Sequence, residues 1–252
     1  LAKRCGDISP VLVVGHRSQV VGQFAGDEVT LVVQDEQLGT GHALLQASDI
    51  LRANADLVLV WAADMPLLSE ETMNKVVVCQ RNNVGPLSMV TIVSDESRGF
   101  GRVLRDENGA VLSVVEENHL TKPQLKIREL NVGVYCFDAE WLWSELPLIA
   151  PSNEGEYYLT DLIDTASRQG HTIGTIMITN ESEAIGVNNR IHLAQAEQAM
   201  RQRVNVDLME RGVTITDPDT VYIDSGVSIG QDTIILPNTH IVGASTVGEE
   251  CI

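Results

Sequence analysis

Short runs of apolar residues recur through the first half of the chain and predict buried β-strands. The runs cover residues 11–15, 29–33, 57–61, 88–93 and 130–137. Apolar residues at helical spacing separate several of them, and residues 102–115 predict a β-hairpin that turns at residues 106–109. Strands that alternate with helices are typical of an α/β fold, in which a mostly parallel sheet carries helices on both faces.

The pattern of apolar positions changes in the last quarter of the chain. Residues 191–211 form the longest predicted helix, whose composition suits a connecting arm. Beyond it, isoleucine or valine recurs every sixth residue, at Ile223, Ile229, Ile235, Ile241 and Val247. Four positions after each stands a small or β-branched residue, at Val227, Thr233, Thr239, Ser245 and Cys251. This is the hexapeptide period of a parallel β-helix.

The composition is that of a globular protein with room for more than one domain, since 44% of the 252 residues are hydrophobic. We expect no membrane span and no secretory signal, because no long uninterrupted apolar run occurs. The four cysteines lie far apart without metal-ligand spacing. We therefore expect a cytoplasmic protein whose cysteines are reduced and mostly buried.

The acidic balance of the chain limits its partners. A formal net charge of −18 argues against nucleic acid and against an anionic membrane surface. The same charge repels a phosphorylated substrate, which would need a cation to bridge it to the protein. Any hypothesis that involves phosphate therefore includes a bound divalent cation.

A polar stretch with two glycines, QDEQLGTGHA at residues 34–43, lies between a predicted strand and a predicted helix. Gly39 and Gly41 carry no Cβ, which would let another molecule approach the backbone closely. Gln34 and Gln37 each offer a donor and an acceptor, with which an amide can read the edge of a base. An ordinary polar turn with a glycine N-cap explains the same stretch, and the loop alone does not decide between the two.

An aspartate follows the apolar run at residues 57–61. Asp64 precedes a proline, and it lies where open α/β sheets bind ligands, beyond the carboxyl end of a strand. A turn or N-cap role is the alternative, but Ser69, followed by two glutamates, is the better start for the next helix. A functional role for Asp64 is therefore favoured.

Polar residues and a glycine mark three further strand or helix ends. Glu116 ends the second strand of the predicted hairpin, while Asn131 begins the next strand and Gly133 interrupts it. Glycine inside a strand often marks the close approach of a ligand or another backbone. Thr160 precedes a predicted helix, where it could act as a cap, but the neighbouring tyrosines favour a sugar contact.

Several motifs, taken in order, resemble a single family. They are QDEQLGTGHA, the ADMP of residues 63–66, GFGR, VVEE, LNVGV, GEYYLTD, GVNNR and the six-residue repeats. Over essentially its whole length the chain is similar to the bacterial bifunctional N-acetylglucosamine-1-phosphate uridyltransferase and glucosamine-1-phosphate acetyltransferase. The resemblance implies a Rossmann-like nucleotidyltransferase domain at residues 1–186, a helical arm at 187–211 and the start of a left-handed β-helix at 212–252. It also implies a cytoplasmic homotrimer that serves peptidoglycan and lipopolysaccharide synthesis.

The resemblance also assigns roles to individual residues. The magnesium ion and the catalytic role would fall to Asp64 and Asn188. Contacts to UTP would come from Gln34, Gln37, Gly39 and Thr40. Contacts to N-acetylglucosamine-1-phosphate, and to the product UDP-N-acetylglucosamine, would come from Gly101, Glu116, Asn131, Tyr158 and Thr160. Acetyl-CoA would bind only where the acetyltransferase part is complete.

The chain departs from the family pattern in several places. The family's glycine-rich opening loop and its later β-helix coils have no match here, so we expect residues 1–252 alone to be inactive. Ala63 replaces the usual glycine before Asp64, which adds a methyl group near the nucleotide. Val132 replaces the common threonine after Asn131.

Physical chemistry favours the same reaction without deciding it. Uridylyl transfer is an in-line attack of a sugar-phosphate oxygen on the α-phosphorus of UTP, which needs alignment and charge neutralisation. Magnesium prefers oxygen ligands, so one carboxylate and one amide suit it. Two other classes stay open, a metal-dependent glycosyltransferase and a non-catalytic scaffold that binds a nucleotide sugar. The glycosyltransferases usually carry two aspartates around one residue, and Ala62 occupies the first of those positions here.

Overall fold

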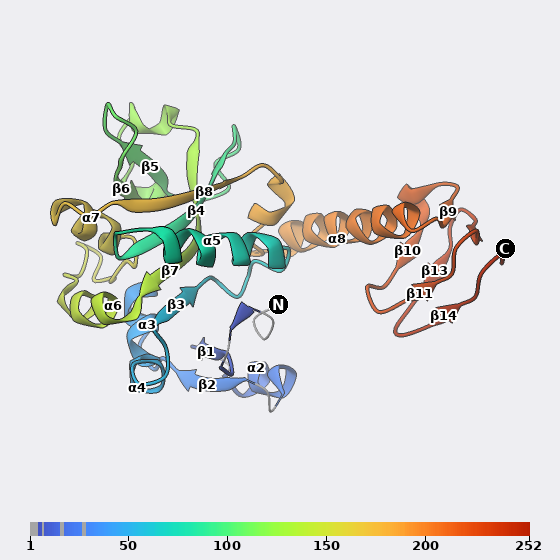
Figure 1. The fold of residues 1–252 in the computed structure, drawn as a ribbon, viewed down its shortest axis with the longest axis horizontal. Coiled ribbons are helices and arrows are strands. Elements are labelled where there is room, and N and C mark those ends of the chain that lie inside the picture. Colours follow the sequence, from blue (N-terminus) through green and yellow to red (C-terminus); the bar gives the residue numbers. More distant parts are fainter. Residues whose placement is uncertain (1–4, 7, 16–17, 27–28) are drawn as a thin grey trace. The chain divides into compact units, whose positions relative to one another are not determined.

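The structure is a computed structural model that describes residues 5–6, 8–15, 18–26 and 29–252 (Figure 1). The chain divides into two compact units. Unit 1 comprises Leu1–Ala63 and Leu68–Ala184, and unit 2 comprises Asp64–Leu67 and Ile185–Ile252. Asp64, although it follows the third strand in sequence, therefore belongs to unit 2.

The centre of unit 1 is a six-stranded sheet in the order β6-β5-β7-β4-β8, with β3 also paired to β7. Its strands are β3 (Leu57–Val60), β4 (Leu87–Val93), β5 (Arg102–Arg105), β6 (Val111–Val115), β7 (Glu129–Asp138) and β8 (Ile173–Ile178). The strands predicted at residues 57–61, 88–93 and 130–137 are confirmed. So is the hairpin, in which β5 and β6 pair antiparallel around a turn that contains Gly109 at a φ of 85°.

The predicted α/β class is confirmed for this unit, but the prediction of a mostly parallel sheet is wrong, because the sheet is mixed. β7 runs antiparallel to β3, β4 and β5, and only β4 and β8 pair in parallel. Parallel neighbours require a crossover connection, usually a helix. β6 and β7 are both antiparallel to β5 and so run in the same direction, and the chain that crosses between them carries two short 3-10 helices, η1 (Glu117–His119) and η2 (Gln124–Lys126), in place of an α-helix.

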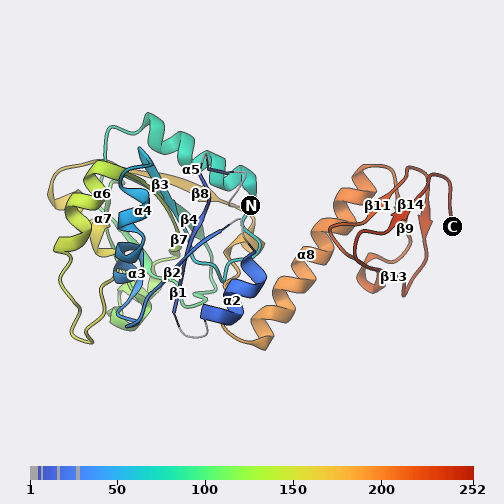
Figure 2. The same ribbon diagram turned by 90° about the horizontal axis from the view of Figure 1, so that it is seen from below.

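The prediction that helices cover both faces of the sheet is confirmed at β4. Leu87 and Met89 lie in the main hydrophobic core, together with residues of α6 (Ala139–Glu145) and α7 (Asp161–Arg168). Ser88, which points to the opposite face, donates a hydrogen bond of 2.7 Å from its hydroxyl to Gln80 Oε1 of α5 (Glu70–Asn82). Figure 2 shows α5 above β4, β7 and β8, all of which it contacts.

The helix α5 begins where the sequence predicts. Ser69 is its N-cap, and the hydroxyl oxygen of Ser69 accepts a hydrogen bond of 3.0 Å from the Thr72 N–H. Glu70 and Glu71 follow in the first turn, where carboxylates are favoured by the helix dipole. Asp64 is thus not needed as a cap.

The first strands of unit 1 form a separate sheet in which β1 (Val11–Val14) and β2 (Thr30–Val33) pair in parallel. The helices α2 (Ser18–Ala25), α3 (Thr40–Gln46) and α4 (Ser48–Leu51) accompany it. The strand predicted at residues 29–33 is present, but the expectation that it is buried is wrong. Leu31 and Val33 are 40% and 47% exposed, although Gly22 of α2 lies close to the Leu31 side chain.

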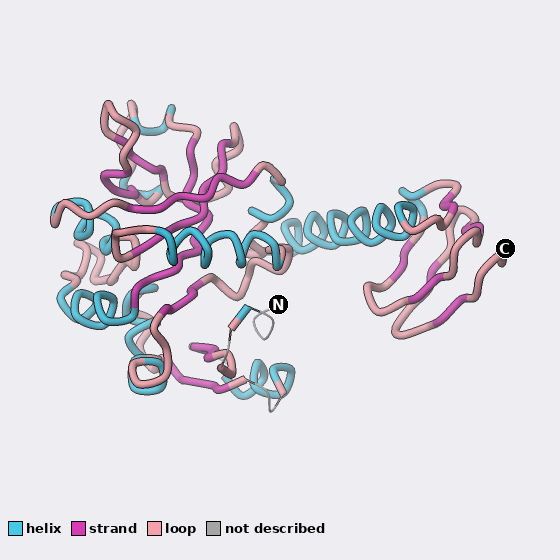
Figure 3. Tube along the Cα trace, in the orientation of Figure 1, coloured by secondary structure: helices cyan, strands magenta, loops and turns pink. Residues whose placement is uncertain are grey.

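Unit 2 contains the long helix α8 (Arg190–Glu210), which confirms the helix predicted at residues 191–211. Short strands separated by loops follow it (Figure 3). They are β9 (Thr214–Ile215), β10 (Tyr222–Ile223), β11 (Ser228–Ile229), β12 (Ile234–Ile235), β13 (His240–Ile241) and β14 (Thr246–Val247). Ile223 pairs in parallel with Ile241, and Ile229 with Val247. The residues of the six-residue period therefore stack, and they share one hydrophobic cluster with Leu208 of α8.

Two expectations from composition concern the whole chain. Within the described ranges, no helix has both the length and the apolar composition of a membrane-spanning segment. All four cysteines are free, but only Cys136 is buried, so the expectation that most of them are buried is wrong. Burial raises the pKa of the Cys136 thiol to about 12, which keeps it protonated.

A bidentate ion pair joins β5 to β7 in unit 1. Arg105 donates to both carboxylate oxygens of Glu129, at 2.8 and 2.6 Å. Burial alone would raise the pKa of Glu129, but the hydrogen bonds and charge of Arg105 hold that pKa below its ordinary value of 4.5. The carboxylate form therefore stabilises the folded state.

We predict that Glu129→Gln lowers the free energy of unfolding by about 1 kcal/mol at neutral pH. The depressed pKa means that this difference is fully present above pH 4.5 and disappears as the pH falls through the folded-state value. Urea unfolding of both proteins between acid and neutral pH measures it. Glu107→Gln, at an exposed position in the β5–β6 turn, is the control. A difference that persists unchanged in acid would contradict the prediction.

Candidate functional site

The loop at residues 34–41 leads from β2 into α3 in unit 1. The Gln34 N–H donates to the Val14 carbonyl at 2.8 Å, and the Gln34 side chain is almost fully buried. The amide nitrogen of Gln37 lies over Gly15, where a Cβ would stand only 2.6 Å from it. Both glutamines predicted to read a base therefore lie at the carboxyl end of β1.

The two glycines of this loop are needed for contact with the chain itself. A Cβ on Gly39 would lie 2.7 Å from the Tyr157 carbonyl oxygen, and one on Gly41 would lie 3.1 Å from it. Gly41 N–H donates to Tyr157 O, and Tyr157 N–H donates to Leu38 O, both at 2.8 Å. The space beside Gly39 and Gly41, which we expected another molecule to occupy, is thus filled by the backbone of residue 157.

The threonine between the glycines extends this connection. Thr40 Oγ1 accepts a hydrogen bond of 3.0 Å from the Leu159 N–H. Tyr158 and Thr160, both predicted to contact the sugar, alternate with the residues that hold this loop. The predicted nucleotide loop and the predicted sugar loop are therefore one hydrogen-bonded unit.

Four of the residues predicted to bind the sugar come together in pairs. The Asn131 N–H donates to the Gly101 carbonyl at 2.9 Å, which joins β7 to the loop before β5. The Thr160 hydroxyl donates to Glu116 Oε1 at 2.7 Å. Thr160 stands at the N-cap of α7 but makes no side-chain cap bond, so the capping alternative is wrong. Its hydroxyl holds the Glu116 carboxylate instead.

Two further residues join this cluster that the sequence does not single out. Asn131 Nδ2 donates to the Tyr135 hydroxyl at 2.6 Å, and burial, followed by the nearby charge of Glu116, raises the Tyr135 pKa. Burial, followed by the charges of Asp164 and Glu116, raises the pKa of the Asp161 carboxyl. The cluster is thus a largely desolvated set of acceptors and donors around Glu116.

A backbone irregularity positions Asn131 and Tyr135. The register between β4 and β7 shifts between Met89 and Thr91, opposite the part of β7 that contains Gly133. Gly133 has a φ of 79°, and a Cβ there would meet nothing within 4 Å. Bulges of this kind turn side chains toward sites. The glycine is therefore required by the backbone conformation, with open space beside it.

Tyr158 lies at the edge of the same cluster. Its ring packs edge-on against His119, with the ring centroids 5.8 Å apart. Burial and the neighbouring Glu156 raise the pKa of the Tyr158 hydroxyl. The phenol therefore stays protonated at neutral pH and is able to donate a hydrogen bond.

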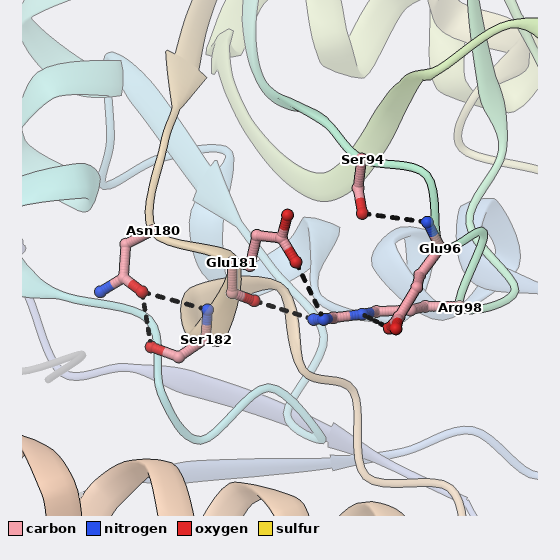
Figure 4. A network of polar contacts seen from close by, with 6 residues as sticks. All are labelled: Ser94, Glu96, Arg98, Asn180, Glu181 and Ser182. Carbon is pink, nitrogen blue, oxygen red and sulfur yellow. Dashed lines mark hydrogen bonds and ion pairs between the residues drawn. The ribbon is translucent and has the colours of Figure 1, made fainter.

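The loop that carries Gly101 is held by a polar network shown in Figure 4. Arg98 donates to the Glu181 carbonyl at 2.8 Å, to the Glu181 carboxylate at 3.3 Å and to Glu96 at 3.3 Å. Ser94 Oγ accepts from the Glu96 N–H at 3.1 Å. The buried side chain of Arg102, the first residue of β5, donates to the Phe100 carbonyl of the same loop. The guanidinium groups of Arg98 and Arg102 thus hold the loop that precedes β5.

The two predicted metal ligands lie in unit 2. The Val187 N–H donates to the Asp64 carbonyl at 2.8 Å, which joins the two segments of this unit. A Cβ built on Gly186 would lie 3.9 Å from Asp64 Oδ2 and 3.9 Å from Asn188 Nδ2. Both side chains are exposed, and their polar ends approach the same point.

This donor set suits a hard divalent cation that keeps most of its other ligands. Rotation of the Asn188 amide would present its oxygen beside the Asp64 carboxylate. No group of three or more His, Cys, Asp or Glu side chains that could hold a metal occurs in the described part of the chain. Magnesium is typically held by one or two protein oxygens, with water and phosphate as further ligands. Asp64 and Asn188 therefore fit magnesium better than a metal that needs a complete protein cage.

Comparison with known proteins decides the family. Residues 16–198, which is most of the chain, match the model of the nucleotidyl transferase family. The chain belongs to the nucleotidyl transferases. Its matched part carries the loop at residues 34–41, the cluster around Glu116, and both Asp64 and Asn188.

Several curated proteins are similar to the chain, and each bears the name bifunctional protein GlmU. The protein of Caldanaerobacter subterraneus subsp. tengcongensis is 39% identical over 251 residues, 99% of this chain and 54% of that protein. Those of Syntrophomonas wolfei and Latilactobacillus sakei are 40% and 38% identical, over 99% and 96% of this chain and 56% and 52% of those proteins. The predicted resemblance is thus confirmed, and the chain spans about half the length of the curated relatives it matches.

The contact between Gly39 and residue 157 gives a prediction for stability. Gly39→Ala should lower the free energy of unfolding by about 3 kcal/mol, because its φ of 97° disfavours alanine and its Cβ would press against Tyr157 O. Gly155→Ala is the matched control, since Gly155 also has a positive φ, of 86°, but open space around its Cβ position. We expect about 1 kcal/mol there. Equal losses in urea unfolding would contradict the role of the contact.

Proposed function

We propose that this nucleotidyl transferase moves a uridylyl group from UTP to N-acetylglucosamine-1-phosphate, which yields UDP-N-acetylglucosamine and pyrophosphate. The observation that carries the proposal is the hydrogen-bonded connection between two loops of unit 1. Residues 38–41 and 157–159 bond to each other directly, and Thr160 next in sequence bonds to Glu116. A molecule with a base at one end and a sugar at the other fits such a connected pair of subsites.

Within unit 1 the proposed roles follow from the donors and acceptors available. Gln34 and Gln37 read the base, and the backbone around Gly39 and Thr40 lines its ribose and phosphates. The sugar is read by Gly101, Glu116, Asn131, Tyr158 and Thr160. A half-buried carboxylate, an amide and two hydroxyls match the hydroxyl and acetamido groups of an N-acetylated sugar.

The transfer itself asks for alignment and charge neutralisation. The attacking and leaving oxygens must lie in line with the α-phosphorus, and no covalent enzyme intermediate is required. Asp64 and Asn188 would hold a magnesium ion. When bound, the ion would neutralise phosphate charge and so overcome the repulsion from a chain of net charge −18.

We also propose the wider organisation that the family resemblance implies. Residues 1–186 would form the nucleotidyltransferase domain, residues 187–211 the arm, and residues 212–252 the start of a left-handed β-helix. Parallel pairing of each short strand with the third strand after it supports the last of these. A homotrimer and an acetyl-CoA-dependent acetyltransferase belong to the same proposal, as further implications of the family resemblance.

Pyrophosphate release tests the proposed reaction. The intact protein that contains these residues is incubated with magnesium and each pair of UTP, CTP or ATP with N-acetylglucosamine-1-phosphate or glucose-1-phosphate. We expect the fastest release with UTP and the N-acetylated sugar, and release should stop when magnesium is chelated. Faster turnover with another pair would assign a different nucleotidyl transfer. Hydrolysis or glycosyl transfer without pyrophosphate release would overturn the proposal.

A further inference from the structure

We propose that His42 selects the base by fixing which end of the Gln34 amide faces the nucleotide. This inference rests on the proposed uridylyl transfer, in which Gln34 reads the base. It concerns a residue for which neither the motif nor the family match gave a role. His42 is therefore a positioning residue that acts through Gln34.

The orientation of the Gln34 amide follows from the atoms around it. Gln34 Nε2 lies 3.2 Å from the Gly39 carbonyl oxygen and 2.9 Å from His42 Nδ1. A carbonyl oxygen only accepts, so the amide atom that faces Gly39 must be the nitrogen. Its two hydrogens are then used by Gly39 and by His42. Because Gln34 is only 9% exposed, water offers these groups little alternative.

The imidazole of His42 must accept at Nδ1 for this arrangement to hold. A neutral imidazole has one acceptor and one N–H, so the proton stands on Nε2. That nitrogen lies 3.2 Å from Gln46 Nε2, which also donates to the His42 carbonyl oxygen at 3.2 Å, but Gln46 is partly exposed, so water can replace its contact with the imidazole. Gln34 has no such exchange with water, because it is almost fully buried and its amide nitrogen is held by both Gly39 and His42. The Tyr157 ring lies beside the imidazole, tilted by 34° and 6.3 Å away between centroids.

The consequence is that Gln34 presents only an acceptor. Among the described residues no hydrogen bond to Gln34 Oε1 is found, so this oxygen is available to a ligand. The pairing edge of uracil offers the N3–H donor, whereas cytosine has a bare acceptor at N3. An acceptor that faces an acceptor leaves both unsatisfied, and buried sites reject such ligands strongly. His42 thus biases the site toward uracil over a base of the same size.

The test compares UTP with CTP in the intact protein that contains these residues. The readout is the ratio of kcat/KM for the two nucleotides, with Kd values from calorimetry alongside. We expect His42→Ala to lower the UTP preference about tenfold or more, because the Gln34 amide then keeps only the longer of its two contacts, 3.2 Å to the Gly39 carbonyl oxygen, and turns more easily. His42→Asn should restore it, since asparagine Oδ1 is attached to Cγ as Nδ1 is and can accept from Gln34. Gln46→Leu, on the opposite side of the ring, should leave the ratio unchanged.

The outcomes separate this inference from the proposed function. If His42→Ala lowers kcat/KM for both nucleotides equally, His42 is merely structural and the inference fails while uridylyl transfer stands. If the unmodified protein does not use UTP, the proposed function itself fails. A measurement on the unmodified protein covers the case in which variants do not fold. Long-range proton–nitrogen NMR correlations should show His42 protonated at Nε2, and a proton on Nδ1 would overturn the inference.

Discussion

Asp64→Ala, made in the intact protein that contains these residues, is expected to lower the kcat of the proposed uridylyl transfer about a thousandfold or more. The carboxylate is one of only two side chains proposed to hold magnesium, and the remaining amide is a weak ligand by itself. Folding should be unaffected. Asp64 is exposed, and its carbonyl, which accepts from the Val187 N–H, is retained in alanine. We expect the thermal midpoint to move by less than about 2 °C.

Two companion variants make this result specific to the metal. Asn188→Ala should raise the magnesium concentration for half-maximal activity by about tenfold or more, because the second ligand is lost. Asp219→Ala removes an exposed carboxylate from the same unit and should change neither quantity. Near-normal turnover of Asp64→Ala at saturating substrates would show that the metal role is wrong, whatever the effect of Asn188→Ala.

Local signals in the sequence are sufficient for most elements of this fold. Ser69 before two glutamates predicts the start of α5, and the turn with Gly109 predicts the hairpin of β5 and β6. Each signal lies within a few residues of the structure it specifies. The repeat that begins at Ile223 is equally local, because its period sets which residues stack.

The direction of β7 is not predictable in the same way. A buried strand has the same apolar run whether its neighbours are parallel or antiparallel. The information lies in the connections, and residues 94–101 and 116–128 are too irregular to predict whether the chain crosses over. The long strand β7 could therefore be located from the sequence, but its three antiparallel neighbours could not.

In the candidate site, too, the important residues could be found in the sequence, but the groups that they contact could not. The glycines at 39 and 41 are visible in the sequence, but the chain segment that they admit lies more than a hundred residues away at Tyr157. The sequence allows the Thr160 hydroxyl to cap α7, but in the structure this hydroxyl donates to Glu116 instead. Tyr135 lies four residues after Asn131, and regular alternation along one strand would place both side chains on the same face. The bulge at Gly133 removes the simple alternation that would relate them.

The second large effect is expected at the sugar subsite, where Glu116→Ala should lower kcat/KM for N-acetylglucosamine-1-phosphate about a hundredfold. The Kd for UTP should change by less than about threefold. Glu116 is an acceptor held in place by the Thr160 hydroxyl, so its removal leaves the substrate group without a partner. Initial-rate kinetics with each substrate varied in turn, together with calorimetry for UTP, measure the two quantities.

Thr160→Val and Glu107→Ala complete this experiment. The valine keeps the shape of threonine but releases the Glu116 carboxylate, so we expect a smaller loss of about tenfold in the use of the sugar phosphate. Glu107→Ala, in the exposed β5–β6 turn, removes an equal charge outside the cluster and should leave the use of the sugar phosphate unchanged. Equal losses for both substrates in Glu116→Ala would mean that the carboxylate supports the whole site. A graded loss confined to the sugar phosphate would mean that Glu116 reads the sugar and that Thr160 positions it.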